Sequence, residues 1–392
     1  MEATEKILFI SHDAGRTGAP IVLLHFLRWL KKNTALSFEI LLKQGGPLER
    51  EFCNLAPTYR LHGWHPPLSL KGIVRKVIPK EQGGAPRADL GRLSARRDWG
   101  LIYSNTITNG AILDGLNGCA CPVISHVHEL EYWIERSGAE NLAQTKQHTT
   151  HYVAVANAVK ENLTRNHGID EEKVSVTSEF IPADNQSVAK TPAAVIRAQL
   201  GIPAGAFVIG GSGAEFWRKG HDLVAPLLLA LKRKAAGREI HFVWVGKEGD
   251  EQQKYELWHD LKHAGVAAKY HGSGEVSNPL DYFAALDAFT LLSREDPFPL
   301  VCLEAALLGK PVLCFAEAGG IPDLVGEDAG FVVPYLDVET MAEKIRLLVE
   351  SPELSARLGS AAAEKVRTRH TLDVTAPKLL KTINQFMRAK NA

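Results

Sequence analysis

Short apolar runs alternate with amphipathic stretches along the whole chain, and two stretches far apart open in the same way. Residues 6–32 pass from an apolar strand through a glycine-containing loop into an amphipathic helix, and residues 207–234 repeat that order. A strand, loop and helix at the start of each half predict two similar α/β domains rather than one continuous sheet. We expect these domains to cover residues 1–185 and 186–372, with the joint in the proline-containing segment 181–192.

The other apolar runs are short and bounded by glycine and proline, with helical patterns between them, which is typical of parallel strands buried on both faces. The final stretch, residues 351–392, has a helical pattern throughout and exceeds what the second domain needs. We therefore expect residues 373–392 to form a terminal helix that packs back on the first domain. The predicted strands are residues 38–42, 101–104, 123–127 and 152–156 in the first half, and 240–245, 288–292, 312–315 and 331–333 in the second.

The composition is that of an ordinary globular protein, with 45% hydrophobic and 23% charged residues. Lysine plus arginine (45) equals aspartate plus glutamate (45), and this neutral balance argues against a protein that coats nucleic acid. No apolar run approaches the roughly 18–20 residues of a membrane-spanning helix, and the first residues lack the pattern of a signal peptide. The five cysteines are few and odd in number, which fits free thiols in a reducing compartment. We expect a cytoplasmic protein without a nucleic-acid partner.

One segment departs from this neutral average. Residues 71–97 contain eight basic and two acidic residues, a net charge of +6. One interpretation is a solvated basic helix–loop–helix, and the other is an electrostatic contact for anionic lipid headgroups or an anionic acceptor. The second interpretation would make the protein peripheral on the inner face of the membrane.

Residues 292–333 carry the most informative chemistry. An acidic turn follows the predicted strand 288–292, and a helix is expected to begin near Pro299, because proline is favoured in the first helical turn. The free amides and the dipole of such a helix start favour a phosphate. Asp296 lies just outside this helix and Glu304 about one and a half turns inside it, so the two acids would bracket a phosphate and hydroxyl groups. The structural alternative is that Asp296 caps the helix and Glu304 is an ordinary helix acid.

This segment resembles the signature of family-4 retaining glycosyltransferases of the GT-B fold. The core of that signature is an acidic residue, seven intervening positions and a glutamate, and Asp296 and Glu304 have this spacing. The matching positions are Ser293, Asp296, Phe298, Leu300, Val301, Leu303, Glu304, Ala305, Gly309, Lys310, Pro311, Val312, Gly319 and Gly320.

The resemblance implies a role for each part of the signature. In that family the first acid contacts the transferred sugar and the second holds the ribose of the donor, and these roles fall on Asp296 and Glu304. The amides between the acids meet the diphosphate, a role that falls on Leu300 and Val301.

Two departures from the family pattern lie in the same donor-binding turn. The first acid is Asp296 where glutamate is usual, with Glu295 beside it as an alternative donor contact and Phe298 two positions further on. Pro299 stands where glycine is common and cannot donate a hydrogen bond, so the phosphate must rely on neighbouring amides.

Adjacent cations, Arg218 and Lys219, follow the first strand of the second domain. A planar guanidinium and a lysine point charge would neutralise a diphosphate leaving group, and a plain surface pair is the alternative. The resemblance implies that they bind the donor pyrophosphate, although the usual arginine position holds Ala214 and Arg218 replaces it. The glycines at 210–213 are not a full dinucleotide fingerprint, because Phe216 occupies the third glycine position.

In the first domain, Gly18 follows the opening strand. A glycine lets a ligand approach the backbone or simply permits the turn into the helix, and in related enzymes this loop borders the diphosphate and the acceptor. His126 and His128 share a strand face, which allows a metal pair or structural histidines. The resemblance instead makes His128 a contact of the donor sugar and Glu129 a contact of the acceptor. In the second domain it makes Val276 the backbone contact of the nucleobase.

Taken together, the resemblance implies two Rossmann-like domains that face each other across a cleft, with the acceptor on the first and the nucleotide sugar on the second. The expected activity is that of a hexosyltransferase, which moves a sugar with retention from a UDP- or GDP-linked donor to a saccharide or lipid-linked acceptor. The expected setting is cell-envelope polysaccharide or glycolipid synthesis, with no metal and no cofactor. The alternatives are a non-catalytic nucleotide-sugar sensor or scaffold, and a GT-B epimerase or phosphorylase.

Overall fold

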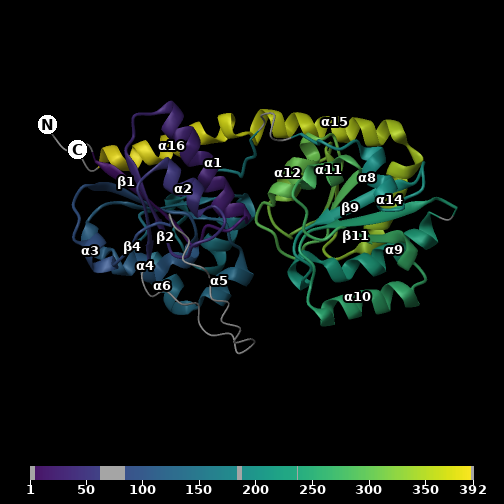
Figure 1. Ribbon diagram of the computed structural model, residues 1–392, viewed down its shortest axis with the longest axis horizontal. Helices are drawn as coiled ribbons and strands as arrows, with labels where there is room; N and C mark the ends of the chain where they lie inside the picture. Colours follow the sequence, from purple (N-terminus) through teal and green to yellow (C-terminus); the bar gives the residue numbers. More distant parts are fainter. Residues whose placement is uncertain (1–4, 62–83, 183–187, 236, 390–392) are drawn as a thin grey trace. The chain divides into compact units, whose positions relative to one another are not determined.

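The computed structural model describes residues 5–61, 84–182, 188–235 and 237–389. The chain forms two compact units (Figure 1). Unit 1 comprises Met1–Thr177 and Ala376–Ala392, and unit 2 comprises Ser178–Thr375. Each unit is a parallel sheet with helices around it, so the predicted α/β class with two sheets is confirmed.

The sheet of unit 1 has eight strands in the order β4-β3-β2-β1-β5-β6-β7-β8, and all of the described pairings are parallel. Strands β2, β5 and β6 are buried at every position, as expected for parallel strands covered on both faces. The strands are β1 (Lys6–Ser11), β2 (Phe38–Leu42), β3 (Thr58–Leu61), β4 (Arg87–Ala88), β5 (Trp99–Ser104), β6 (Val123–Val127), β7 (His151–Ala154) and β8 (Val174–Val176).

Helices of unit 1 follow these strands, and α1 buries one apolar face that includes Val22, Phe26 and Leu30. The ring centroid of Phe386, in the terminal helix α16, lies 4.8 Å from that of His151 on β7. The helices are α1 (Gly18–Asn33), α2 (Glu49–Leu55), α3 (Leu90–Ser94), α4 (Gly110–Gly115), α5 (Glu131–Ser137), α6 (Ala139–His148), α7 (Asn157–Glu161) and, from Ala376 onward, α16 (Leu372–Ala389).

The sheet of unit 2 has six parallel strands in the order β11-β10-β9-β12-β13-β14. Its core is built from strand side chains such as Phe242 and Phe315 and helix side chains such as Leu228. The elements are β9 (Phe207–Ser212), β10 (Ile240–Val245), β11 (Tyr270–Gly272), β12 (Ala288–Leu291), β13 (Val312–Phe315) and β14 (Gly330–Val333), with α8 (Ala193–Gln199), α9 (Val224–Lys234), α10 (Glu251–His263), α11 (Pro279–Ala284), α12 (Leu300–Leu307), α13 (Ile321–Val325), α14 (Val338–Glu350) and α15 (Pro352–Arg369).

The expectation of continuous helix over residues 351–392 is wrong in one place. α15 ends at Arg369 and α16 begins at Leu372, because the backbone between them pairs with the segment that follows Thr177. The amide of Ile181 donates to the carbonyl of His370 at 3.0 Å, and the amide of Leu372 donates to the carbonyl of Ile181 at 3.0 Å. These hydrogen bonds replace helical ones at this point. In the part of the chain that the structure describes, no helix has both the length and the apolar character of a membrane span.

Candidate functional site

The carboxyl edge of the sheet in unit 2 brings three predicted residues together. Arg218 and Lys219 lie in the tight turn after β9, and Asp296 follows β12. The Lys219 Nζ donates to Asp296 Oδ2 at 2.5 Å, and Ser293 Oγ donates to the same oxygen at 3.0 Å. Arg218 Nη1 lies 3.8 Å from Asp296 Oδ1, and only 5% of Asp296 is exposed. We call Arg218, Lys219 and Asp296 the carboxyl-edge cluster.

Two glycines allow the backbone to approach this cluster closely. Gly220 has a φ of +72°, and a Cβ there would lie 1.8 Å from the carbonyl oxygen of Leu292. Gly319 has a φ of +142°, and a Cβ there would lie 1.8 Å from the carbonyl oxygen of Asp296. A larger residue at either position would push apart the turns that hold the cluster.

Arg218 is buried but only partly satisfied. Its Nη1 donates to the carbonyl oxygen of Glu295 at 2.6 Å, and its guanidinium lies 5.5 Å from the ring centroid of Phe216. Among the described residues, no acceptor reaches its Nε. Buried donors are almost always paired, so this nitrogen marks a place where an anion would complete the site.

Helix α12 begins directly beside the cluster. It runs Leu300–Leu307 with Pro299 as its N-cap, and in the described chain no backbone acceptor is found for the amides of Leu300 and Val301. Such amides and the helix dipole attract negative charge. The side chain of Phe298 points elsewhere, because it is buried with its ring centroid 5.2 Å from that of His370. Phe298 therefore shapes the turn by packing, and any contact it makes with a donor would come from its backbone.

Glu304 lies in the middle of α12 and is partly buried. Within the described residues, no hydrogen bond or ion pair reaches its carboxylate, and burial raises the pKa of Glu304 to about 7. A buried carboxylate without a partner is costly, so it is a candidate for binding rather than for stability. Val276 follows β11 at the same edge of the sheet and is partly exposed.

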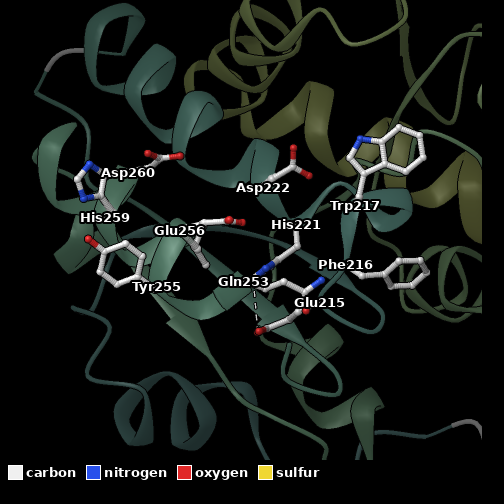
Figure 2. Close-up of a pocket in the computed structure, with 11 residues that line it drawn as sticks. Glu215, Phe216, Trp217, His221, Asp222, Gln253, Tyr255, Glu256, His259 and Asp260 are labelled. Carbon is white, nitrogen blue, oxygen red and sulfur yellow. Dashed lines mark ion pairs between the residues drawn. The ribbon is translucent and has the colours of Figure 1, made fainter. Parts of the chain in front are cut away.

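A buried polar network that the sequence did not reveal holds both ends of the Arg218–Lys219 turn (Figure 2). Glu215 precedes the turn and accepts a hydrogen bond from the amide of Gly249 at 2.9 Å. His221 follows the turn, and its Nε2 lies 2.8 Å from the hydroxyl of Tyr270 and 3.4 Å from Glu215 Oε1. No motif signals this network, because its members come from three separate segments of the chain.

In unit 1, the structure connects His128 to the loop that contains Gly18. Nε2 of His128 lies 3.1 Å from Oδ1 of Asn105, and Nδ2 of Asn105 donates to the carbonyl oxygen of Ala19 at 2.9 Å. Asn105 was not predicted, although its place directly after β5 could have indicated it. Gly18 is exposed, and a Cβ there would meet nothing within 4 Å, so neither packing nor a left-handed φ requires glycine.

Glu129 is a buried residue that organises this loop. Its carboxylate accepts hydrogen bonds from the amide of His128 at 2.9 Å and the amide of Ile107 at 3.2 Å, and also from the hydroxyl of Thr106. It is 7% exposed, so this geometry makes it a group that positions the loop, and the expected contact with the acceptor stays a prediction.

The neighbouring histidine, His126, is fully enclosed. Its Nδ1 lies 2.9 Å from the hydroxyl of Tyr103, and its ring centroid lies 4.2 Å from that of His128. Burial holds the pKa of His126 well below its ordinary value. The described residues contain no group of three or more His, Cys, Asp or Glu side chains that could hold a metal ion. This environment favours the structural interpretation of His126.

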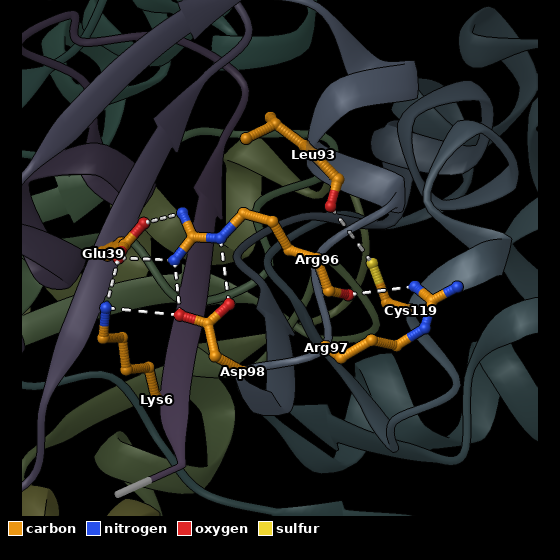
Figure 3. A network of polar contacts seen from close by, with 7 residues as sticks. All are labelled: Lys6, Glu39, Leu93, Arg96, Arg97, Asp98 and Cys119. Atoms are coloured by element: carbon orange, nitrogen blue, oxygen red, sulfur yellow. Dashed lines mark hydrogen bonds and ion pairs between the residues drawn. The ribbon is translucent and has the colours of Figure 1, made fainter. Parts of the chain in front are cut away.

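The amino edge of the same sheet contains a second charge cluster (Figure 3). The guanidinium of Arg96 donates to both oxygens of Glu39 at 2.6 and 2.8 Å and to Asp98 at 2.6 and 2.9 Å, and Lys6 Nζ lies 3.0 Å from Glu39. Burial raises the pKa of Glu39, but the hydrogen bonds from Arg96 and Lys6 outweigh burial and keep this pKa below its ordinary value. Hydrogen bonds from Arg96 lower the pKa of Asp98 to about 2. We call Lys6, Glu39, Arg96 and Asp98 the amino-edge network.

This network removes Arg96 from the bases that either interpretation of residues 71–97 could use. Residues 71–83 lie outside the described residues, and the remainder contains β4 and α3. Arg96 is paired internally and stacks 4.6 Å from the ring centroid of Trp99, so it does not belong to a free cationic surface.

Comparison with known proteins connects unit 2 to a family. Residues 193–365 match the family described as Glycosyl transferases group 1. The lipopolysaccharide core biosynthesis glycosyltransferase LpsD of Rhizobium meliloti is 31% identical over 175 residues, which cover 45% of this chain and 48% of that protein. A D-inositol 3-phosphate glycosyltransferase of Streptomyces scabiei is 29% identical over 224 residues, covering 53% of this chain and 48% of that protein. The chain thus spans about half the length of these relatives.

Solved structures resemble the whole chain. Anabaena HepE in complex with UDP and glucose has a TM-score of 0.78 at 20% identity, covering 97% of this chain and 99% of that one. Sucrose-phosphate synthase from Thermosynechococcus elongatus has a TM-score of 0.75 at 18% identity, covering 98% and 100%. The comparisons therefore confirm the GT-B fold and the resemblance of the second half to the group 1 glycosyl transferases.

Proposed function

We propose that this protein transfers a sugar, with retention of anomeric configuration, from a nucleotide diphosphate donor to an acceptor hydroxyl. The observation that carries the proposal is the carboxyl-edge cluster. Buried Arg218 and half-buried Lys219 share one carboxylate there, beside a helix start whose first amides have no backbone acceptor among the described residues. Cations and backbone amides are the groups that stabilise a departing diphosphate.

The diphosphate would lie against Arg218, Lys219 and the amides of Leu300 and Val301. Lys219 now neutralises Asp296, and a bound diphosphate would share that lysine. Asp296 would then accept a hydrogen bond from a hydroxyl of the transferred sugar. Glu304 would accept hydrogen bonds from the ribose hydroxyls, which would lower its raised pKa and hold it ionised.

The geometry does not favour Asp296 as a covalent nucleophile. Its Oδ2 is held by both Lys219 and Ser293, so it is a poorly nucleophilic carboxylate. We therefore assign the base to an oxygen of the departing phosphate, which would receive the proton of the acceptor hydroxyl as the new bond forms on the same face of the sugar. No metal or cofactor is needed in this scheme.

Unit 1 would supply the acceptor side and further donor contacts. His128 would contact the donor sugar and the backbone at Gly18 would border the diphosphate, with Glu129 fixing the loop behind His128. In unit 2, the backbone around Val276 would contact the nucleobase. The solved HepE structures contain UDP and UDP-glucose, so a uridine donor is the first to test, ahead of a GDP-linked one.

The relatives suggest the biological setting. LpsD is named for lipopolysaccharide core biosynthesis, and a further relative, CapM of Staphylococcus aureus, for capsular polysaccharide biosynthesis. We propose a saccharide or lipid-linked acceptor of the cell envelope, reached by an enzyme of the cytoplasm. If the protein attaches to the inner face of the membrane, we propose that the basic residues of segment 71–97 other than Arg96 contact anionic lipid headgroups; residues 71–83 of this segment lie outside the described residues.

The test is a panel of UDP- and GDP-linked sugars, with binding measured by calorimetry and turnover by release of the nucleotide. We expect binding of at least one donor, slow hydrolysis, and transfer to an added acceptor. Nuclear magnetic resonance of the product would show whether the anomeric configuration is retained. Donor binding without any transfer would favour the non-catalytic sensor, and neither binding nor hydrolysis would refute the proposal.

A further inference from the structure

Unit 2 contains a cavity of about 450 Å³ between the 215–222 loop and helix α10. Figure 2 shows Phe216 and Trp217 on one side of it and Tyr255 on the opposite side, with His221 and Gln253 between them. The carboxyl-edge cluster, Leu300 and Glu304, which all belong to the candidate donor site, are not among its lining residues. The cavity is therefore distinct from the donor site, although the two adjoin through the Arg218–Lys219 turn.

We propose that this cavity binds a neutral saccharide, as a second carbohydrate site outside the donor site. Its walls offer flat apolar rings for the C–H faces of a sugar, and its rim offers carboxylates that accept hydrogen bonds from hydroxyl groups. A mostly apolar cavity with a few convergent polar groups is the usual form of a small-molecule site.

The aromatic walls are unusually exposed. Trp217 is 59% exposed and Tyr255 is 67% exposed. Exposed aromatic side chains that gather on one surface commonly mark a binding site, since their large apolar area gains by being covered. Here they belong to different elements, the turn after β9 and helix α10, so they form the two sides of one groove.

The floor of the cavity is a buried polar network. Glu215 is 7% exposed and His221 is 4% exposed, and both contact the hydroxyl of Tyr270. Burial raises the pKa of Glu215 and lowers the pKa of His221 to about 4, so His221 is uncharged at neutral pH. Perturbed titratable groups at the base of a cavity are characteristic of functional sites.

The charges around the cavity select the class of ligand. Among the described residues that line it, none is lysine or arginine, which disfavours a phosphate or another anion. A cation would need a buried counter-ion, but Glu215 already accepts hydrogen bonds from Gly249 and Tyr270, and Asp222 is paired with Arg294 at 2.7 Å.

The remaining carboxylates, Glu256 and Asp260, lie on exposed positions of α10. An ion pair with an organic cation is worth little at such exposed sites. A neutral sugar needs only hydrogen-bond acceptors there, and these two carboxylates supply them.

This inference goes beyond the proposed function, because the cavity would bind a sugar without taking part in the transfer reaction. The guanidinium of Arg218 lies 5.5 Å from the ring centroid of Phe216, so one wall of the cavity contacts the donor-binding cation. An oligosaccharide held in the cavity would lie beside the place where the donor sugar reacts, as an anchor for a longer saccharide.

The experiment titrates the full chain, without a nucleotide sugar, with maltotriose, cellotriose and chitotriose, followed by calorimetry and tryptophan fluorescence. We expect at least one of them to bind with a Kd of about 0.1 to 10 mM, the range for a small open site. Tyr255→Ala and Asp260→Asn should each weaken that binding, the first by at least about tenfold. Trp133→Ala is the matched control, since Trp133 is 42% exposed on α5 of unit 1.

Three results would overturn the proposal: no binding of the three trisaccharides up to about 10 mM, binding that Tyr255→Ala leaves unchanged, or displacement of the sugar by spermidine. Lys219→Ala separates this site from the proposed function. That variant should lose donor turnover and still bind the trisaccharide as the wild type does.

Discussion

The amino-edge network and the carboxyl-edge cluster each gather charges around a buried carboxylate, Glu39 and Asp296, but they are completed differently. In the amino-edge network two cations face two carboxylates, and each carboxylate oxygen has a cationic partner. In the carboxyl-edge cluster two cations converge on Asp296 alone, while Nε of Arg218 has no acceptor among the described residues. The first arrangement is satisfied by the protein itself, and the second is one that a ligand would complete.

The two assemblies also lie at opposite ends of their strands. The amino-edge network lies where β1, β2 and β5 begin, and the carboxyl-edge cluster lies where β9 and β12 end. In parallel α/β sheets, ligands bind at the carboxyl ends of the strands. This comparison predicts that changes at the amino edge reduce stability with activity intact, whereas changes at the carboxyl edge reduce activity more than stability.

The largest effect is expected for Arg96→Met. The substitution leaves Glu39 buried without its main partner, and breaking a buried ion pair in this way costs about 3 kcal/mol. Urea denaturation would measure the free energy of unfolding. Arg97→Met is the control, because Arg97 is exposed and its hydrogen bonds within the described residues go to backbone carbonyls, so its substitution should cost less than about 0.5 kcal/mol. A loss below about 1 kcal/mol for Arg96→Met, or a loss of donor turnover per folded molecule, would contradict the comparison.

Lys219→Ala should have the next largest effect, and on activity. In the proposed function Lys219 stabilises the departing diphosphate, so its removal should lower kcat/KM for the donor by on the order of 100-fold, which is about 2.7 kcal/mol. Donor turnover would be measured by nucleotide release, with Lys378→Ala as the control because Lys378 is exposed on α16. Unchanged kinetics would remove Lys219 from the site.

Glu304→Gln tests, through pH, a carboxylate for which the described residues provide no hydrogen bond or ion pair. The pKa of Glu304 is about 7 in the folded protein and near its ordinary value of 4.5 in the unfolded chain. Between these values the folded state holds more protons, so stability falls as pH rises from about 4.5 to about 7. Glutamine cannot ionise, so the variant should gain stability over the wild type through this window, on the order of 2 kcal/mol above pH 7.

The same substitution should weaken donor binding, because an amide is a poorer acceptor for two ribose hydroxyls than a carboxylate; we expect a loss of about tenfold. Thermal unfolding between pH 4 and pH 8 and calorimetry with the donor nucleotide would measure the two effects. If the stability of the variant changed with pH in the same way as that of the wild type between pH 4 and pH 8, Glu304 would not titrate as proposed.

The sequence predicted the parts of this protein that depend on local pattern. Strands β2, β6, β10 and β13 have the predicted bounds, because each is a short apolar run between clear breaks. Strands β3, β4 and β8 were not predicted, since each is short and includes a polar residue, so none forms an apolar run.

The same limit applies to the candidate site. Asp296, Glu304 and the cations Arg218 and Lys219 lie in recognisable segments, and the structure joins all of them except Glu304 by direct contacts. The Glu215–His221–Tyr270 contacts and the position of Asn105 depend on how distant strands are brought together, which no local pattern records.

The smallest effect on stability is expected at Gly18, and it sharpens the comparison between structural and ligand-facing positions. Gly18→Ala adds a methyl group that meets nothing within 4 Å, so the free energy of unfolding should change by less than about 0.5 kcal/mol. Gly220→Ala is the contrasting variant, because its Cβ would lie 1.8 Å from the carbonyl oxygen of Leu292, and it should be clearly destabilised. If the backbone at Gly18 borders the donor or the acceptor, the added methyl group should raise KM for one of them by about fivefold or more while folding is unaffected. Steady-state kinetics with each substrate varied in turn would show whether the added methyl group affects the donor or the acceptor. If both KM values remained those of the wild type, Gly18 would be an ordinary turn residue that borders neither substrate.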